Sequence, residues 1–182
     1  MKIRLIAGEF GGRTLDTPPG KRTKPMGERI RGALFNIIGD EIKDAHVLDA
    51  FAGTGSLGLE ALSRGATEAV FIEKDRLAHK ILQQNIHDLG VQSRVKVIQA
   101  RVAAWIENNQ QQRFDIIFAD PPYHDTQFST VKHLFSLLKS NGLMVLSYPG
   151  RGEAPPGTNG VVVVDNRSYS NAALTFYRRK DN

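Results

Sequence analysis

Short apolar segments alternate with amphipathic segments along most of this chain, and this alternation constrains the fold more than any other feature. Helical crossovers join parallel strands, so the pattern predicts an α/β fold with helices on both faces of a mostly parallel sheet. The predicted strands cover residues 47–50, 69–72, 94–99, 114–119 and 143–147. The predicted helices cover residues 56–64, 75–89, 102–109 and 127–139. We expect the last of these helices to stop at Asn141-Gly142.

The two ends of the chain depart from this alternation. Towards the end, two predicted strands have no helix between them, which indicates an antiparallel hairpin at the edge of the sheet. Near the start, two short strands around a glycine-containing turn precede a helix that stops at Gly39. These elements cover residues 2–7, 12–17, 28–38, 161–164 and 172–177. We therefore expect an N-terminal extension over residues 1–40 and a main domain over residues 41–182.

The composition is that of one globular domain. The chain has 182 residues, of which 41% are hydrophobic and 24% charged, and it has no cysteine. The lack of cysteine excludes a disulfide scaffold, a thiolate metal site and a cysteine nucleophile. No run approaches the roughly 18 apolar residues that cross a bilayer, and the start of the chain lacks the apolar core of a signal peptide. We expect a cytoplasmic protein without a membrane partner, and no cluster of carboxylates and histidines indicates a metal.

The net charge of +5 comes from one end of the chain. Residues 1–31 contain eight basic and three acidic side chains, whereas the remaining residues contain sixteen of each. A neutral body with a basic arm favours a phosphate-rich partner such as a nucleic acid, although a merely solubilising surface has the same composition. The candidate RNA contacts are Arg13, Lys21, Arg22, Lys24, Arg29 and Arg31.

The first strand of the main domain runs directly into the sequence Asp49-Ala-Phe-Ala-Gly-Thr-Gly-Ser-Leu-Gly58. Its glycines have the Gly-x-Gly-x-x-Gly spacing that lets a nucleotide approach the backbone at the start of a helix. Glu73 ends the next strand, where a carboxylate can accept hydrogen bonds from both ribose hydroxyls. The glycines could instead serve only a tight turn, but the strand, the helix and the acid together favour a nucleoside cofactor.

Asp49 narrows the choice of cofactor. A carboxylate beside the glycine loop repels a pyrophosphate and attracts the ammonium and sulfonium groups of S-adenosylmethionine. The alternative is that Asp49 only organises the loop.

A second motif, Asp120-Pro-Pro-Tyr123, follows the strand at 114–119. Its prolines fix the backbone and lack N–H groups, so nearby carbonyls are free to accept hydrogen bonds. The Asp120 carboxylate and the Pro121 carbonyl can hold both N–H bonds of an exocyclic amine on a nucleobase, and Tyr123 can stack on the base. Two prolines in a loop often form only a rigid turn, but this motif stands at the switch point where open α/β sheets bind ligands. The pattern therefore predicts methylation of a nucleobase amine.

Taken together, these motifs resemble the RsmD family of bacterial methyltransferases, which modify the guanine N2 of 16S ribosomal RNA. The similarity extends to Arg4-Leu-Ile-Ala-Gly8, Glu28-Arg-Ile-Arg-Gly-Ala-Leu-Phe-Asn36, Ile72-Glu-Lys-Asp75 and Leu174-Thr-Phe-Tyr177. The resemblance implies a Rossmann-like class I methyltransferase fold, in which a seven-stranded, mostly parallel sheet has an antiparallel last strand. It also implies S-adenosylmethionine as cofactor, S-adenosylhomocysteine as product, and a monomer acting on 16S rRNA in an assembled or assembling small ribosomal subunit.

The resemblance also implies roles for individual residues. The target base would be held by Asp120, Pro121, Pro122 and Tyr123, and the cofactor by Asp49, Phe51, Gly53, Thr54, Gly55, Glu73, Lys74, Arg101 and Val102. Arg101 departs from the family, which usually has an Asp or Asn there to accept from the adenine amine. An arginine cannot accept a hydrogen bond, so the backbone at Val102 or another residue would have to read the adenine edge.

Two other functions stay open at this point. The same motif serves methyltransferases of adenine N6 in DNA or RNA, although a DNA enzyme would be expected to carry a separate recognition domain. A non-catalytic RNA-binding assembly factor could keep the fold, but the intact Asp49, Glu73 and Asp120 argue against it. A nicotinamide dehydrogenase would need a substrate domain, for which no sequence is left.

Overall fold

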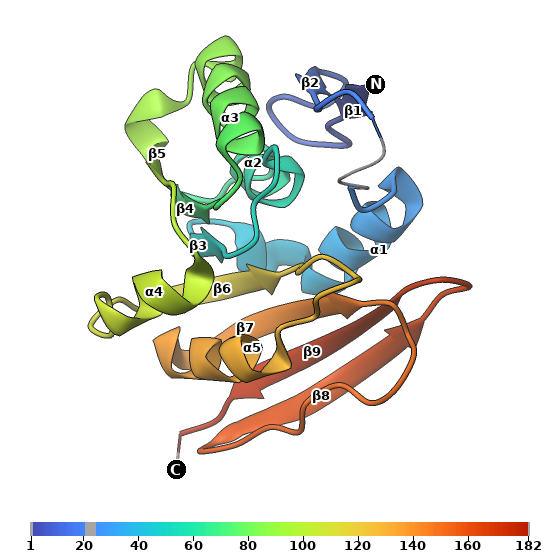
Figure 1. Ribbon diagram of the computed structural model, residues 1–182, viewed down its shortest axis with the longest axis vertical. Helices are drawn as coiled ribbons and strands as arrows, with labels where there is room; N and C mark the ends of the chain where they lie inside the picture. The colour runs from blue at the N-terminus through green and yellow to red at the C-terminus, as the bar shows by residue number, and fades with distance from the viewer. Residues whose placement is uncertain (1, 21–24, 182) are drawn as a thin grey trace.

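The computed structural model describes residues 2–20 and 25–181, and within them one seven-stranded sheet forms the centre of the molecule (Figure 1). The strands lie in the order β5-β4-β3-β6-β7-β9-β8. They span β3 His46–Asp49, β4 Glu68–Ile72, β5 Val95–Ile98, β6 Phe114–Ala119, β7 Leu138–Tyr148, β8 Val161–Ser168 and β9 Ala173–Arg179. Strand β9 runs antiparallel to both of its neighbours, whereas β3 to β7 pair in parallel. This arrangement confirms the predicted sheet and its antiparallel last strand.

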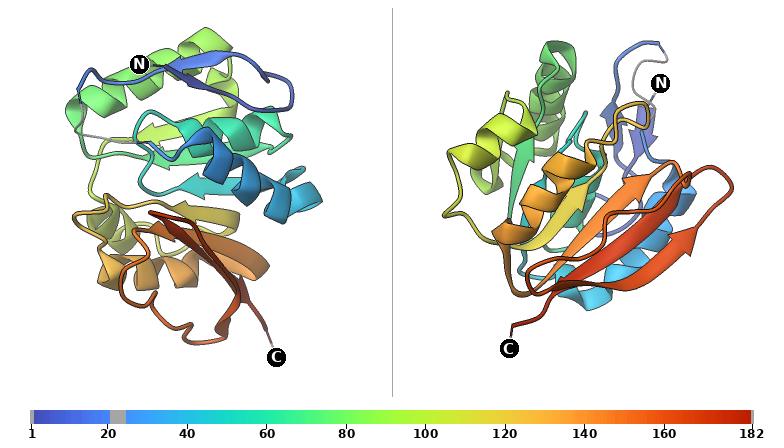
Figure 2. Two further views of the ribbon diagram at one scale, coloured as in Figure 1. Left: turned by 90° about the vertical axis from the view of Figure 1, so that its right-hand side faces the viewer. Right: turned by 60° about the horizontal axis from the view of Figure 1, so that its bottom comes forward.

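Helices cover both faces of the sheet (Figure 2). On one face lie α1 Glu28–Ile38, α2 Ser56–Ser63 and α3 Arg76–Leu89, and on the other α4 Val102–Glu107 and α5 Phe128–Leu134. Short 3-10 turns span Gly39–Ile42, Gln92–Arg94 and Phe135–Leu137. Alternate strand residues enter the two cores: Phe71 and Phe118 pack under α1 to α3, whereas Ile72 and Ile117 pack under α4 and α5. None of the helices in the described residues has the length and apolar character required to span a membrane.

The N-terminal hairpin is present but shorter than its sequence predicts. Strand β1 Lys2–Arg4 pairs antiparallel with β2 Thr14–Asp16, and Ile3, Leu5 and Leu15 join the core beneath α1 to α3. The predicted strand continued to residue 7, but the N–H groups of Ile6 and Ala7 donate to the Glu60 carboxylate, 2.9 and 3.2 Å away. The ladder stops there because these donors bond to a side chain of α2.

Glu60 also explains why one predicted RNA contact is wrong. Arg31 is only 1% exposed, and its Nη1 donates to Glu60 Oε1 over 2.7 Å while its Nη2 donates to the Arg4 carbonyl. Arg64 Nε supplies a further donor to the same carboxylate at 2.9 Å. Arg31 therefore belongs to a buried ion pair that connects the hairpin to α1 and α2, and it cannot reach an RNA phosphate.

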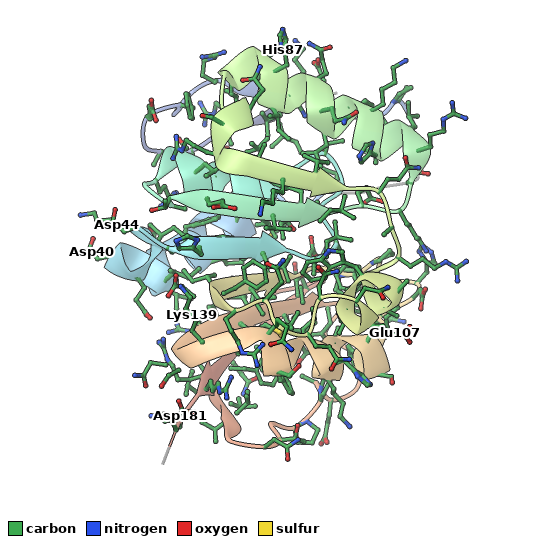
Figure 3. All side chains as sticks on the ribbon, turned by 90° about the vertical axis from the view of Figure 1, so that its left-hand side faces the viewer. Asp40, Asp44, His87, Glu107, Lys139 and Asp181 are labelled. Atoms are coloured by element: carbon green, nitrogen blue, oxygen red, sulfur yellow. The ribbon has the colours of Figure 1, made fainter. Side chains whose placement is uncertain are left out.

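The chain between α5 and β7 also differs from the prediction. The helix expected over residues 127–139 ends at Leu134, a 3-10 turn follows, and β7 begins at Leu138, opposite Phe114 of β6. Lys139, labelled in Figure 3, lies 3.2 Å from Asp115 Oδ2 across the same strand pair. The pairing then shifts register, and Asn141 has a φ of 62°. Asn141-Gly142 thus belongs to an irregularity within a strand rather than to a helix end.

Candidate active site

The carboxyl ends of the parallel strands meet at one edge of the sheet, and most of the predicted site residues gather there. Asp49 ends β3 and pairs in register with Phe118 of β6. The loop after Asp49 is tied to both neighbouring strands, since Ala50 N donates to the Phe118 carbonyl and Ala52 N to the Ile72 carbonyl. The β3 and β6 ends are therefore adjacent, as the switch-point argument requires.

Each glycine of the loop is explained by a different physical constraint. Gly55 has a φ of +96°, and a Cβ there would lie 2.5 Å from Leu82 Cδ1. A Cβ on Gly58 would lie 2.2 Å from the Phe71 ring, so close packing of α2 excludes a side chain. Gly53, with a φ of +57°, has no atom within 4 Å of its Cβ position. The open space beside Gly53 is where a ligand can approach the backbone.

Asp49 is buried and only half satisfied. Its Oδ2 accepts a hydrogen bond from Gly58 N at 2.9 Å, whereas its Oδ1 is buried with no hydrogen-bond partner among the described residues. Burial raises the pKa of Asp49 to about 7, and the charges of Asp120 and Glu73 push it in the same direction. One oxygen thus organises the glycine loop, and the other is an acceptor that lacks a donor or a cation.

Glu73 follows β4 and connects the glycine loop to the next strand. Its Oε1 accepts from Gly53 N at 2.8 Å and its Oε2 from Asp75 N at 2.7 Å. Burial raises its pKa against the opposing effect of these two bonds. Each carboxylate oxygen has a second lone pair, so Glu73 can also accept from two hydroxyls of a ligand.

An open cleft of about 500 Å³ lies beside Glu73, past the ends of β4 and β5. Its lining residues are Lys74, Asp75, Arg76, Gln99, Ala100 and Arg101. Lys74 and Arg101 are therefore exposed at this cleft. Val102 buries its side chain in the core, and its N–H belongs to the first turn of α4, where amides have no acceptor within the helix. The sequence argument did not select Arg76 or Gln99, although both stand within a few residues of a strand end.

Asp120 directly follows β6, and it is partly exposed. Burial raises its pKa to about 6, while a hydrogen bond from Ser147 acts in the opposite direction. Pro121 is buried, and the Pro122 carbonyl accepts from Asp125 N at 2.9 Å, which closes a turn. The Tyr123 side chain is 42% exposed, yet its hydroxyl lies 2.9 Å from Ser147 Oγ. Ser147 thus adjoins a candidate site residue, although no sequence motif marked it.

The other candidate residues of the glycine loop, Thr54 and Phe51, contact different parts of the structure. Thr54 is 7% exposed, and its carbonyl accepts from Asn85 Nδ2 at 3.0 Å. Phe51 is half-buried and packs against the core under α4 and α5. Asn85 also bonds to the backbone of Asp16 in β2, so one side chain links the N-terminal hairpin to the glycine loop.

Apart from Arg31, two of the candidate RNA contacts lie in the described residues. Arg13 is exposed at the hairpin, where its Nη2 donates to the Asp88 carbonyl, and Arg29 is exposed on α1. Lys21, Arg22 and Lys24 lie outside the described residues. Residues 2–20 and 25–181 contain no group of three or more His, Asp or Glu side chains able to hold a metal ion.

Comparisons with known proteins identify the family of this chain. The family described as conserved hypothetical protein 95 matches residues 3–178. Ribosomal RNA small subunit methyltransferase D of Haemophilus influenzae is 37% identical over 142 residues, which cover 77% of this chain and 72% of that protein. YlbH of Bacillus subtilis is 28% identical and covers 98% of this chain and 100% of its own length. The solved structure of yhhF from Escherichia coli has a TM-score of 0.88 at 30% identity, with 99% of both chains covered. The chain therefore belongs to the conserved hypothetical protein 95 family, the RsmD family that its motifs resemble.

Proposed function

We propose that this protein transfers a methyl group from S-adenosylmethionine to the exocyclic N2 of a guanine in small-subunit ribosomal RNA. The observation that carries the proposal is the adjacency of two motifs: the glycine loop with its half-satisfied Asp49, and Asp120-Pro-Pro-Tyr123 at the next strand end. One motif suits a cationic nucleoside cofactor and the other suits a planar amine.

The electrostatics of the site support this cofactor. Asp49, Asp120 and Glu73 share one electrostatic environment, in which each charge on a neighbour raises the pKa of Asp49. Such an environment disfavours a phosphate and favours a positively charged ligand. When bound, S-adenosylmethionine would supply a methyl group activated by a sulfonium. Asp49 would hold the positive end of this cofactor, Glu73 would accept from its ribose hydroxyls, and the cleft beside Arg101 would hold its adenine.

The Asp120 motif would act on the base by positioning it. A guanine amine is a poor nucleophile because its lone pair is delocalised into the ring. Above pH 6 the Asp120 carboxylate is mostly ionised and can accept one N–H, and the Pro121 carbonyl can accept the other. Asp120 can also take the proton that leaves as the nitrogen gains its methyl group. The exposed Tyr123 ring offers a stacking surface, so the target would be an unpaired or flipped-out base.

The relatives and the charge distribution support the choice of substrate. The Haemophilus relative is named for the small ribosomal subunit. The basic excess of the chain lies within residues 1–31, outside both motifs. The full proposal is a cytoplasmic monomer that methylates 16S rRNA in an assembled or assembling subunit, with the basic arm on the RNA backbone.

One experiment tests the proposal against its rivals. Ribosomal RNA from cells with and without this protein is digested, and its methylated nucleosides are compared by mass spectrometry. We expect a single N2-methylguanosine to disappear from 16S rRNA and to return with the wild-type chain but not with Asp120→Ala. Loss of N6-methyladenosine instead would assign the adenine function. An unchanged set of methylated nucleosides would favour a non-catalytic assembly factor.

A further inference from the structure

We propose that Ser147 is a positioning residue, whose hydroxyl joins the Asp120 carboxylate and the Tyr123 hydroxyl in one hydrogen-bond chain that orients both groups around the target base. The inference rests on the proposed function, because it assigns Asp120 and Tyr123 to the base. It adds a residue from a different strand, outside every motif that the sequence marked.

The position of Ser147 follows from the strand pairing. Strand β7 runs parallel to β6, with Leu146 opposite Ala119, so Ser147 lies beside Asp120 just past the paired ends. Ser147 is 2% exposed, and its side chain points to the face of the sheet opposite to Leu146 and Tyr148, which pack in the core under α4 and α5. A buried hydroxyl is costly unless it is hydrogen-bonded; the Ser147 Oγ lies 2.9 Å from the Tyr123 hydroxyl, and the strand register places it beside Asp120.

The direction of the chain is determined by counting protons. An ionised carboxylate can only accept, so in the proposed chain Ser147 donates its single proton to the adjacent Asp120. The Ser147 oxygen is then left as an acceptor, and the Tyr123 hydroxyl, 2.9 Å away, must donate to it. The two motif residues therefore depend on one another through Ser147 whenever Asp120 carries its charge.

This chain has two consequences for the base site. The bond from Ser147 stabilises the charged form of Asp120, which is the form able to accept an N–H from the amine. The bond from Tyr123 anchors the polar end of a side chain that is otherwise 42% exposed. The ring is then held in one orientation before the base arrives, which is the condition for effective preorganisation.

The test compares Ser147→Ala with Ser147→Thr, which keeps the hydroxyl. The Asp120 carboxyl is titrated by carbon-13 NMR in the free protein, and single-turnover methyl transfer to the small subunit is measured between pH 5 and 9. In Ser147→Ala we expect the pKa of Asp120 to rise by about one pH unit, because a charge-assisted hydrogen bond is lost. The acidic limb of the pH–rate profile should shift to higher pH by the same amount. Methyl transfer at neutral pH should fall by about 10- to 100-fold, while S-adenosylmethionine affinity stays within about threefold. Ser147→Thr should restore most of the rate.

Thr175→Val is the matched control. Thr175 lies on the neighbouring strand β9, is 1% exposed, and donates its hydroxyl to Asn166 Oδ1 at 2.8 Å, away from the Asp120 motif. Its substitution removes a buried hydroxyl from the same sheet and should leave the Asp120 titration and the rate profile unchanged. Tyr123→Phe breaks the same chain at its exposed end, so it tests the inference even if Ser147→Ala fails to fold. The double variant with Ser147→Ala and Tyr123→Phe should lose less methyl-transfer activity than the two single losses predict together, because both substitutions break the same hydrogen-bond chain.

The outcomes separate this inference from the proposed function. An active wild-type enzyme with an unchanged Asp120 titration and rate profile in Ser147→Ala would overturn the role of Ser147 alone. A wild-type protein that methylates no guanine in the subunit would overturn the proposed function. The NMR titration would still report in that case whether Ser147 stabilises the charged form of Asp120.

Discussion

Replacing Asp49 by Asn should stabilise the free protein while weakening its hold on the cofactor. The buried carboxylate has an Oδ1 without a partner, and burial raises its pKa from 3.8 to about 7. The folded protein therefore holds this proton more tightly than the unfolded chain does. Between these two pKa values the folded state binds more protons, so the stability contribution of Asp49 falls as pH rises from about 4 to 7 and is lowest above 7.

The magnitude of the stabilisation follows from the difference between the pKa values of Asp49 in the folded and unfolded states. A difference of about three pH units corresponds to roughly 4 kcal/mol of free energy of unfolding lost at pH 8. An asparagine keeps the acceptor for Gly58 N but introduces a buried amide N–H without an acceptor, which costs about 1–3 kcal/mol. The net gain of Asp49→Asn at pH 8 is then about 1–3 kcal/mol, or a Tm increase of about 2–12 °C for a chain of this length. At pH 5 the destabilisation that the buried Asp49 charge causes is smaller by about 2–3 kcal/mol, so Asp49→Asn should stabilise the protein little or not at all.

Urea denaturation at pH 5 and pH 8 measures the change directly. Asp88→Asn, on the exposed face of α3, controls for the loss of one negative charge. Calorimetry should show that wild-type affinity for S-adenosylmethionine increases with pH up to about 7 and that Asp49→Asn binds it more weakly at pH 8. Equal stabilisation at both pH values, or a loss of stability at pH 8, would refute the assignment of the buried charge.

Three further substitutions test the other parts of the site. Asp120→Ala should lower methyl transfer by about 100-fold or more while cofactor affinity changes only a few-fold, since we propose that Asp120 holds the amine; near wild-type turnover with saturating RNA contradicts this. Glu73→Ala should weaken S-adenosylmethionine binding by about 10- to 100-fold, or roughly 1.5–3 kcal/mol, and unchanged affinity in calorimetry would move the ribose contact elsewhere. Changing Lys21, Arg22 and Lys24 together to Ala should weaken RNA binding equally across sequences and flatten the slope of log affinity against log salt by roughly two to three units. An unaltered slope with unaltered RNA affinity would mean that the arm is only a soluble surface.

The sequence predicted the sheet well because buried parallel strands have a simple signature. Each is a short apolar run between loops, and the helices between them show a clear apolar periodicity. Helix α1 ends where it was expected, since Gly39 adopts a φ of 58° that favours glycine. The boundary between α5 and β7 was missed because apolar residues continue through 137 and 138, and only pairing with Phe114 decides that Leu138 is a strand residue.

The site was predictable where a motif carries the chemistry and hidden where a tertiary contact does. Asp49 and Glu73 could be selected because strand ends converge in any parallel sheet. Arg31 looked like a surface cation of a basic segment, and nothing local distinguishes it from Arg29. Its burial depends on Glu60, which lies twenty-nine positions away. Ser147 had no signal either, because a single serine in an apolar strand becomes informative only beside Asp120.

The contacts of Glu60 also determine how this protein can be recombined with its relatives. Its buried carboxylate receives donors from Ile6, Ala7, Arg31 and Arg64, so most of its partners lie before β3. A chimaera that exchanges only the hairpin must resupply the two backbone amides in the same geometry, or it leaves a buried charge short of donors. A crossover placed after α1 transfers hairpin and Arg31 together and keeps three of the four donors in one parent. The N-terminal hairpin is therefore best exchanged as one unit with α1.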